Sequence, residues 1–445
     1  MFCEEGDEVT AVMGAAFAPA APRHQVRAGV PAGKSGQLSI RYRDPSHEAL
    51  PHFVSFSGGR SSAALTFMLA EAGVLRPSRG DAVLFANTSA EHPGTYEFAA
   101  RCKERIESEF GIPFFWFEFC TVEDAWRSEY RRRASYRLVK PVPVEEDPDG
   151  FRFSGEAFEE MLALQGMLPN PHSRTCTAKL KLYPSHELLS EWIAETPGPA
   201  HAGHHWGVNL VDVGEAVATH ARMGGHTPPD QILMRAEHLD QKPSSRPAQL
   251  WKDFTSAPVP AGKPGPPAPM RGPKGALHIR LLGLRADESP RVDRVLSRTI
   301  FAEGATSAKC TVRTQPPGER PYFPLHDAGL DAGSVVDFWK SQSFDLSVPA
   351  GAGNCVYCFM KGTRILGTIA SSEDPQRRSC TPTDIGWWAD IEKRYARVTP
   401  ARDGSGISRF GFFGVNTLSY TEVSINGISR KGRYATGTPA CDCTD

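Results

Sequence analysis

The chain has 445 residues, a formal net charge of −1 at pH 7 and 40% hydrophobic residues. This length suggests two or three domains with a real core. The near-neutral charge gives no overall reason to expect a nucleic acid or a membrane surface as partner. No run approaches the ~20 apolar residues of a membrane span. The N-terminus lacks the basic region of a signal peptide, so we expect a cytoplasmic protein.

The first 50 residues are rich in Pro, Gly and Ala, and we expect a flexible lead. Residues 52–56 then predict a strand, and residues 64–72 show the apolar spacing of a helix. Between them stands the turn Ser57-Gly58-Gly59-Arg60-Ser61-Ser62. Glycines let a backbone approach a ligand closely, and the amides at a helix N-terminus attract anions. The stretch therefore predicts a phosphate-binding turn.

Further strands are predicted at residues 81–86, 112–119 and 277–284, with a helix at 95–110. This order predicts an α/β fold with a doubly wound, mostly parallel sheet. Polar residues follow two of the strands, where such sheets bind ligands. They include Asn87 and Glu91 after the second strand, and Arg285, Glu288 and Arg291 after the fourth.

The middle of the chain holds two basic stretches and an insertion. Residues 127–137 read as a solvated basic helix face, with contact to nucleic acid phosphates as the alternative. Residues 171–184 place Arg174, Lys179 and Lys181 around Cys176, and cations there lower a thiol pKa and attract phosphate. Residues 197–275 read as a Pro- and Gly-rich insertion with surface histidines.

The chain has 10 cysteines, which favour metal, cluster or redox chemistry over a disulfide framework. Cys355 and Cys358 form a C-x-x-C pair on a Gly-rich turn, typical of a metal knuckle or a redox pair. A four-ligand site needs two more thiolates, for which we consider Cys176 and Cys310 first and Cys380 as a competitor. Helices are predicted near residues 332–341 and 385–397. The tail ends with Cys441 and Cys443, a sulfur carrier or a segment without a role.

Four of these segments resemble the PP-loop ATP pyrophosphatase superfamily, in its phosphoadenosine phosphosulfate reductase-like branch. They are SGGRSS, FANTSAEHPGT, the R-x-C-T-x-x-L-K-x-x-P element at 174–184 and the G-x-R-x-x-E-S-x-x-R element at 283–291. The resemblance covers residues 52–196 and 277–365. It implies a nucleotide-binding domain at 51–300 and a cluster-binding C-terminal region at 301–445.

The resemblance implies that ATP and Mg²⁺ bind through a defined set of residues: Ser57, Gly58, Gly59, Arg60, Ser61, Ser62, Asn87, Glu91, Arg174, Arg285 and Glu288. Phosphate charge in the reaction would be stabilised by Arg60, Lys181, Arg285 and Arg291. The segment GNCVYCFMKG resembles one that carries an iron–sulfur cluster. We therefore expect a [4Fe–4S] cluster on Cys176, Cys310, Cys355 and Cys358, with zinc as the rival.

The implied activity is an ATP-dependent sulfurtransferase or adenylyl transferase that cleaves ATP between its α- and β-phosphates. A cysteine desulfurase is the implied sulfur donor, and a nucleic acid is one candidate acceptor. Two departures from the family's patterns leave alternatives open. Ser61 stands where many relatives have an acid, which admits a non-catalytic nucleotide sensor. A sulfonucleotide reductase is the other alternative, although the E-C-G-[IL]-H context of its catalytic cysteine is absent.

Overall fold

The computed structural model describes residues 38–126, 129–193, 204–208, 238, 249–259, 278–302, 318–401, 404 and 406–426, with the side chains of 123–133, 204–208, 298–302 and 425–426 excepted. The strands run β1 His52–Phe56, β2 Ala82–Asn87, β3 Phe114–Trp126, β4 Glu129–Leu138, β5 Lys140–Pro143, β6 Gly150–Phe151, β7 His204–Val208, β8 His278–Leu282, β9 Glu319–Tyr322, β10 Arg397–Pro400, β11 Ile407–Gly411 and β12 Gly414–Val415. The helices are α1 Arg60–Glu71, α2 Pro93–Phe110, α3 Glu156–Gln165, α4 Tyr183–Ile193, α7 Ser289–Ala302, α8 Pro324–Asp327, α9 Ala332–Lys340, α10 Thr363–Ser371, α11 Ile385–Tyr395 and α12 Tyr420–Asn426.

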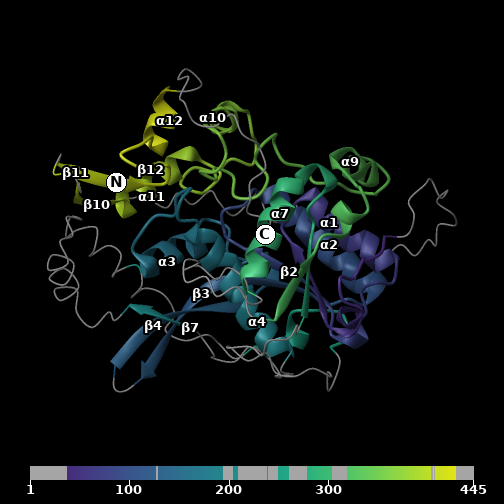
Figure 1. The fold of residues 1–445 in the computed structure, drawn as a ribbon. Coiled ribbons are helices and arrows are strands. Elements are labelled where there is room, and N and C mark those ends of the chain that lie inside the picture. Colours follow the sequence, from purple (N-terminus) through teal and green to yellow (C-terminus); the bar gives the residue numbers. More distant parts are fainter. Residues whose placement is uncertain are drawn as a thin grey trace.

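Among the described residues, the central sheet has seven strands in the order β7-β4-β3-β2-β1-β8-β9 (Figure 1). The five strands from β3 to β9 in this order are parallel. The remaining two, β4 and β7, pair antiparallel at one side. The fold is therefore α/β with a mostly parallel sheet, as the sequence predicted.

The sheet is covered by helices on both faces because apolar side chains alternate along its buried strands. Val54 and Phe56 of β1 belong to a core formed with α1, α2 and α9. Phe53, on the opposite face of the same strand, packs in a second core with Leu188 and Trp192 of α4. This two-sided pattern is the expected doubly wound arrangement.

The strand order reverses direction between β1 and β8. From β1 the chain proceeds outward through β2 and β3, whereas β8 and β9 extend to the other side. In open α/β sheets such a switch point opens a crevice at the carboxyl ends of the two strands, where ligands bind. The turn after β1 and the segment after β8 are therefore neighbours at the carboxyl edge of the sheet.

The C-terminal elements form a further apolar cluster with α3. It includes Phe158 of α3, Trp388 of α11, Tyr420 of α12, and both Cys355 and Cys358. Figure 1 shows α10, α11 and α12 together with β10, β11 and β12 on one side of the central sheet. The cysteine pair thus sits in the packing between the C-terminal elements and the α/β layers.

The prediction of a helix face at residues 127–137 was wrong. Residues 129–138 form β4, which pairs with the whole second half of β3, from Phe117↔Leu138 to Trp126↔Glu129. Tyr136 and Leu138 are buried in the core on the α4 face, so strand pairing and burial overrode the basic composition.

Part of the expected insertion also belongs to the fold. β7 joins the central sheet, and Trp251 and Phe254 pack in the core beside α4. The histidine side chains predicted to lie on the surface there fall outside the described residues. No helix in the described ranges is long and apolar enough to cross a membrane.

Candidate functional site at the β1/β8 switch point

The turn after β1 closes on itself through one hydroxyl. The amide of Ser57 donates to Oγ of Ser62 at 3.0 Å, and that Oγ donates to the carbonyl oxygen of Gly59 at 3.0 Å. Gly58 has φ +78°, and a Cβ there would lie 2.5 Å from the Cγ2 atom of Thr95. Only glycine fits this position without a shift. The buried Ser62 therefore shapes the turn, and its contact with a ligand stays a prediction.

The segment after β8 touches the start of α1. A Cβ on Gly283 would lie 2.8 Å from Cα of Ser62 and 2.9 Å from its amide nitrogen. Two residues later, Nη1 of Arg285 donates to Oγ of Ser61 at 2.9 Å. The structure thus brings together two of the predicted segments, which lie more than 200 residues apart in the chain.

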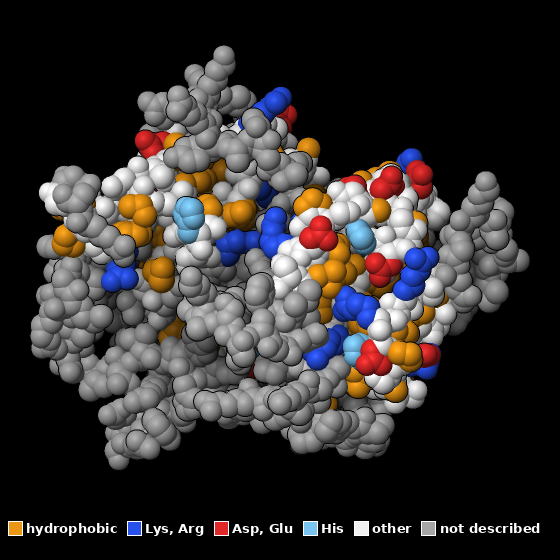
Figure 2. All heavy atoms as spheres, viewed as in Figure 1, with side chains coloured by type: hydrophobic (Ala, Val, Ile, Leu, Met, Phe, Trp, Pro, Cys, Tyr) orange, Lys and Arg blue, Asp and Glu red, His pale blue; other side chains and the backbone are white. Residues whose placement is uncertain are grey.

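The N-terminus of α1 faces this junction without a side-chain cap. Its N-cap is Gly59, for which no side-chain hydrogen bond is formed, and the turn residues Ser57, Gly59 and Ser61 remain partly exposed. Uncapped amides and the helix dipole favour an anion there. Figure 2 shows Lys and Arg side chains near the middle of one face, between the C-terminal elements and the part that holds α1 and α2.

The predicted cations differ in what they already contact. Arg285 forms ion pairs with Asp287 at 3.0 Å and with Glu288 at 3.4 Å. Burial alone would lower the pKa of Arg285, but the hydrogen bond to Asp287 and the charge of Glu288 raise it above its ordinary value. Arg291 also pairs with Glu288. Glu288 therefore lies between two arginines and can orient both.

The guanidinium of Arg60 forms a salt bridge with Asp345, away from the glycine turn. Its Nε and Nη2 donate to the two carboxylate oxygens of Asp345 at 2.7 and 2.9 Å, and Nη2 also donates to the carbonyl of Leu346. A phosphate-binding role for Arg60 would require this bidentate pair to open. In the structure it ties the start of α1 to the segment after α9.

The residues after β2 form a closed polar network. The carboxylate of Glu91 accepts hydrogen bonds from Thr88 Oγ1 at 2.6 Å and Tyr96 Oη at 3.1 Å. Asn87 donates to Glu118 at 2.9 Å, and its Oδ1 accepts the amide of Ser89. Both predicted ligands are buried and hold the loop in shape, and their contact with a nucleotide remains a prediction.

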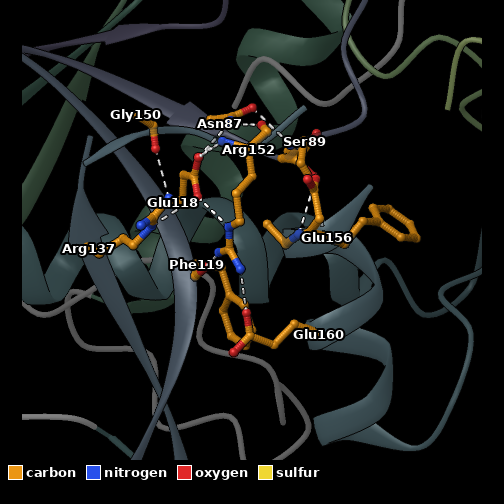
Figure 3. A network of polar contacts seen from close by, with 12 residues as sticks. Asn87, Ser89, Glu118, Phe119, Arg137, Gly150, Arg152, Glu156 and Glu160 are labelled. Atoms are coloured by element: carbon orange, nitrogen blue, oxygen red, sulfur yellow. Dashed lines mark hydrogen bonds and ion pairs between the residues drawn. The ribbon is translucent and has the colours of Figure 1, made fainter. Parts of the chain in front are cut away.

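Sequence reasoning missed a buried charge cluster at this edge of the sheet, drawn in Figure 3. Arg152 donates to Glu118 at 2.6 Å and to Glu160 at 2.7 Å. Burial alone would lower the pKa of Arg152, but the two carboxylates outweigh it and raise the pKa. Arg137 also reaches Glu118, at 3.3 Å. The sequence contained one signal for this cluster, because Glu118 is a charged residue near the end of the predicted strand 112–119. Its partners are distant in sequence and could not be predicted.

The turn that contains Cys355 and Cys358, here called the cysteine knuckle, is attached to the end of β2. Glu91 and Cys355 form an antiparallel bridge, the amide of Val356 donates to the carbonyl of Ala90 at 3.0 Å, and Thr88 Oγ1 lies 3.3 Å from Cys355 Sγ. Because β2 is next to β1, the knuckle lies at the same edge of the sheet as the glycine turn.

A buried lysine holds the knuckle from within. Nζ of Lys361 donates to the carbonyl oxygens of Gly353, Cys355 and Val356 at 2.9, 2.8 and 2.8 Å. The Lys361 amide also donates to the carbonyl of Cys358 at 2.9 Å. One ammonium group thereby donates hydrogen bonds to three carbonyl oxygens of the turn. These bonds hold the backbone that carries both cysteines.

Cys176 joins the knuckle from another part of the chain. It packs against the apolar cluster that contains Cys355 and Cys358. Burial first, and then negative charge on Cys358, Glu392, Cys355 and Cys176, raises the pKa of Tyr420 well above its ordinary value. Cys310 falls outside the described residues. The prediction of Cys380 as a competing ligand was wrong, because Cys380 is disulfide-bonded and offers no thiolate.

All three thiols belong to or pack against one apolar cluster, and thiolates are ligands that soft metals prefer. Within the described ranges, however, no group of three or more His, Cys, Asp or Glu side chains is arranged to hold a metal ion. The fit is therefore partial: the thiols meet in one region, and the fourth predicted ligand is not among the described residues.

The segment around Cys176 has an uncommon backbone. Residues Thr177–Leu182 form a π-helix, with Cys176 at its N-cap, and such turns occur often at functional sites. Arg174, Lys179 and Lys181 are all partly buried there. Burial lowers the pKa of Lys179 to about 7. These cations are neighbours of Cys176 in the chain, and their contact with a phosphate stays a prediction.

Comparisons with known proteins add little. No family model matches the chain, and no solved structure matches it. A stretch of 62 residues, 14% of this chain, is 34% identical to the uncharacterized nin region protein ORF290 of Escherichia phage lambda. The match covers 21% of that phage protein. The similarity is local, so the function must be argued from the site.

Proposed function

We propose that this chain binds an adenine nucleotide at the β1/β8 crevice and acts as an ATP-dependent sulfurtransferase or adenylyl transferase of the PP-loop type. The observation that carries the proposal is the contact of Arg285 with Ser61 above the tight approach of Gly283 to Ser62. It unites a glycine turn, an uncapped helix N-terminus and a guanidinium at the switch point. These are the parts that a polyphosphate site requires.

In the proposed reaction an acceptor oxygen attacks the α-phosphorus of ATP, and the bond to the bridging oxygen breaks so that pyrophosphate leaves. A sulfur nucleophile then displaces AMP from the adenylated acceptor. The amides at the start of α1 hold phosphate oxygens, and Arg285 stabilises the negative charge that develops on them. Arg291 acts through Glu288, which orients Arg285. Magnesium would arrive with the phosphates, since Glu91 is already hydrogen-bonded within its loop.

The thiols beside this crevice support the sulfur part of the proposal. Cys355, Cys358 and Cys176 would hold an iron–sulfur cluster together with Cys310, or a zinc ion in its place. A bound cluster would supply a thiophilic or redox centre. The reductase alternative depends on Cys441 and Cys443, which lie outside the described residues, so no described contact favours it.

The test separates nucleotide binding from metal binding. The protein is purified anaerobically and analysed for iron, zinc and acid-labile sulfide. ATP affinity is measured by calorimetry, and AMP and pyrophosphate are measured after incubation with total tRNA or duplex DNA. We expect Arg285→Met to weaken ATP binding at least tenfold, whereas Arg364→Met, an exposed arginine on α10, leaves it unchanged. Cys355→Ser is expected to lose metal and retain ATP.

Absence of ATP binding, or an unchanged affinity in Arg285→Met, would overturn the assignment of the crevice. Tight binding without AMP formation under any condition would favour the nucleotide sensor. A protein without iron, zinc or sulfide after anaerobic purification would remove the metal part alone.

A further inference from the structure

A second group prepared for an anion lies on the face of the sheet that α4 covers. Arg280 is on β8, in register with Phe53 of β1, and Phe53 packs against α4. The side chain is buried, with 8% of the residue exposed. Its Nη1 has no hydrogen-bond partner in the described part of the chain. A buried guanidinium whose N–H groups lack a hydrogen-bond acceptor destabilises the folded state, and a bound anion would remove that cost.

The carboxylate of Glu319, whose charge acts on Arg280, forms no hydrogen bond with it in the described part of the chain. Glu319 of β9 lies against two histidines, with its Oε2 3.3 Å from Nε2 of His278 and 3.9 Å from Nε2 of His186. Burial raises the pKa of Glu319, but the hydrogen bond from His278 and the charge of Arg280 outweigh this and lower it to about 2. Glu319 is therefore ionised at neutral pH. It attracts Arg280 electrostatically, but within the described ranges the two side chains form no salt bridge.

Two further polar atoms on the same face also lack partners. His278 stands two residues before Arg280, and because strand side chains alternate, both face α4. Nε2 of His278 is used by Glu319, which leaves its buried Nδ1 without a partner. Ser55 of β1 lies on this face opposite Leu282, two residues beyond the position that pairs with Arg280, and its buried Oγ has no partner in the described part of the chain. Ser55 is partly exposed, so the group is not sealed from solvent.

We propose that Arg280, with Ser55 as a second donor, binds a tetrahedral oxyanion, phosphate or sulfate, either free or as a group of a larger molecule. The guanidinium and the serine hydroxyl supply donors for its oxygens. His278 lies on the other side of Arg280 from Ser55, where its Nε2 is hydrogen-bonded to Glu319. This site lies on the α4 face, whereas the glycine turn leads into α1 on the opposite face. It is therefore additional to the proposed nucleotide crevice and does not depend on it.

The experiment uses the full chain and four probes: inorganic phosphate, inorganic sulfate, AMP and ATP. Binding is measured by equilibrium dialysis with labelled ions, and thermal unfolding is recorded with and without each probe. The variants are Arg280→Met, which keeps the volume without the charge, and Arg285→Met at the crevice. Arg320→Met is the matched control, because Arg320 lies on the neighbouring strand β9 and faces the other side of the sheet.

We expect one ion to bind per chain and to raise the unfolding temperature. Arg280→Met should weaken this binding at least tenfold while ATP binding persists, and Arg320→Met should retain both. Without added anion, Arg280→Met should be at least as stable as the original protein, since an unmatched buried charge has been removed. Loss of AMP binding together with ion binding would show that the anion is part of a nucleotide.

Three results would overturn the proposal. One is the absence of saturable binding of any probe. Another is ion binding that Arg285→Met abolishes and Arg280→Met leaves intact, which would place the ion in the crevice. The last is an Arg280→Met protein that is less stable in the absence of anions and shows no difference in their presence, which would make Arg280 a structural charge.

Discussion

Replacing Gly283 by alanine tests whether the two sides of the switch point are held at a fixed distance. The new Cβ would lie 2.8 Å from Cα of Ser62, 2.9 Å from its nitrogen and 3.1 Å from the carbonyl carbon of Ser61. All three are backbone atoms, so α1 or the end of β8 must move. Overpacking of this kind costs ~1–3 kcal/mol, and a displacement near 1 Å at a binding site lowers function by about 100-fold.

The assay combines urea unfolding with calorimetric ATP titration. We expect the free energy of unfolding to fall by ~1–3 kcal/mol and ATP affinity to fall by about 10- to 100-fold. Gly353→Ala is the control, because no atom lies within 4 Å of the corresponding Cβ. If Gly283→Ala keeps the stability and the ATP affinity of the original protein, then the close approach does not shape a nucleotide site.

Three other predictions concern the surroundings of the site. Arg152→Met leaves Glu118 and Glu160 buried without their shared cation, so unfolding free energy should fall by ~3–5 kcal/mol in urea titrations, and an unchanged midpoint would contradict this. Lys361→Met removes three hydrogen bonds to the knuckle; metal analysis should show weakened retention of iron or zinc, whereas Lys340→Met on α9 should have no effect. Burial, followed by the charge of Arg79, lowers the pKa of His52 to about 3, so the unfolded chain binds more protons between pH ~3 and ~6.5 and stability should fall as the pH decreases through this window. Urea titrations of His52→Gln should show a flatter dependence on pH there, and an identical slope would refute the assignment.

The sequence alone identified most of the α/β layer. The predicted strand at residues 52–56 is confirmed as β1, and the predicted helix at 95–110 is confirmed within α2. These predictions succeeded because apolar periodicity and glycine turns are local signals. The same signals indicated which polar residues follow the strands. Strand β4 was missed, because its basic residues resemble a solvated face until the pairing with β3 is known.

Only the tertiary structure decided what each predicted residue contacts. Arg285 meets Ser61, whereas Arg60 is paired with Asp345 and Glu91 is enclosed by Thr88 and Tyr96. The buried pairing of Arg152 with Glu118 and the unmatched guanidinium of Arg280 were also invisible in the sequence. A local pattern shows that a side chain can donate or carry charge. Its partners come from strand order and from packing between distant segments, which determine whether that capacity is already used or is left for a ligand.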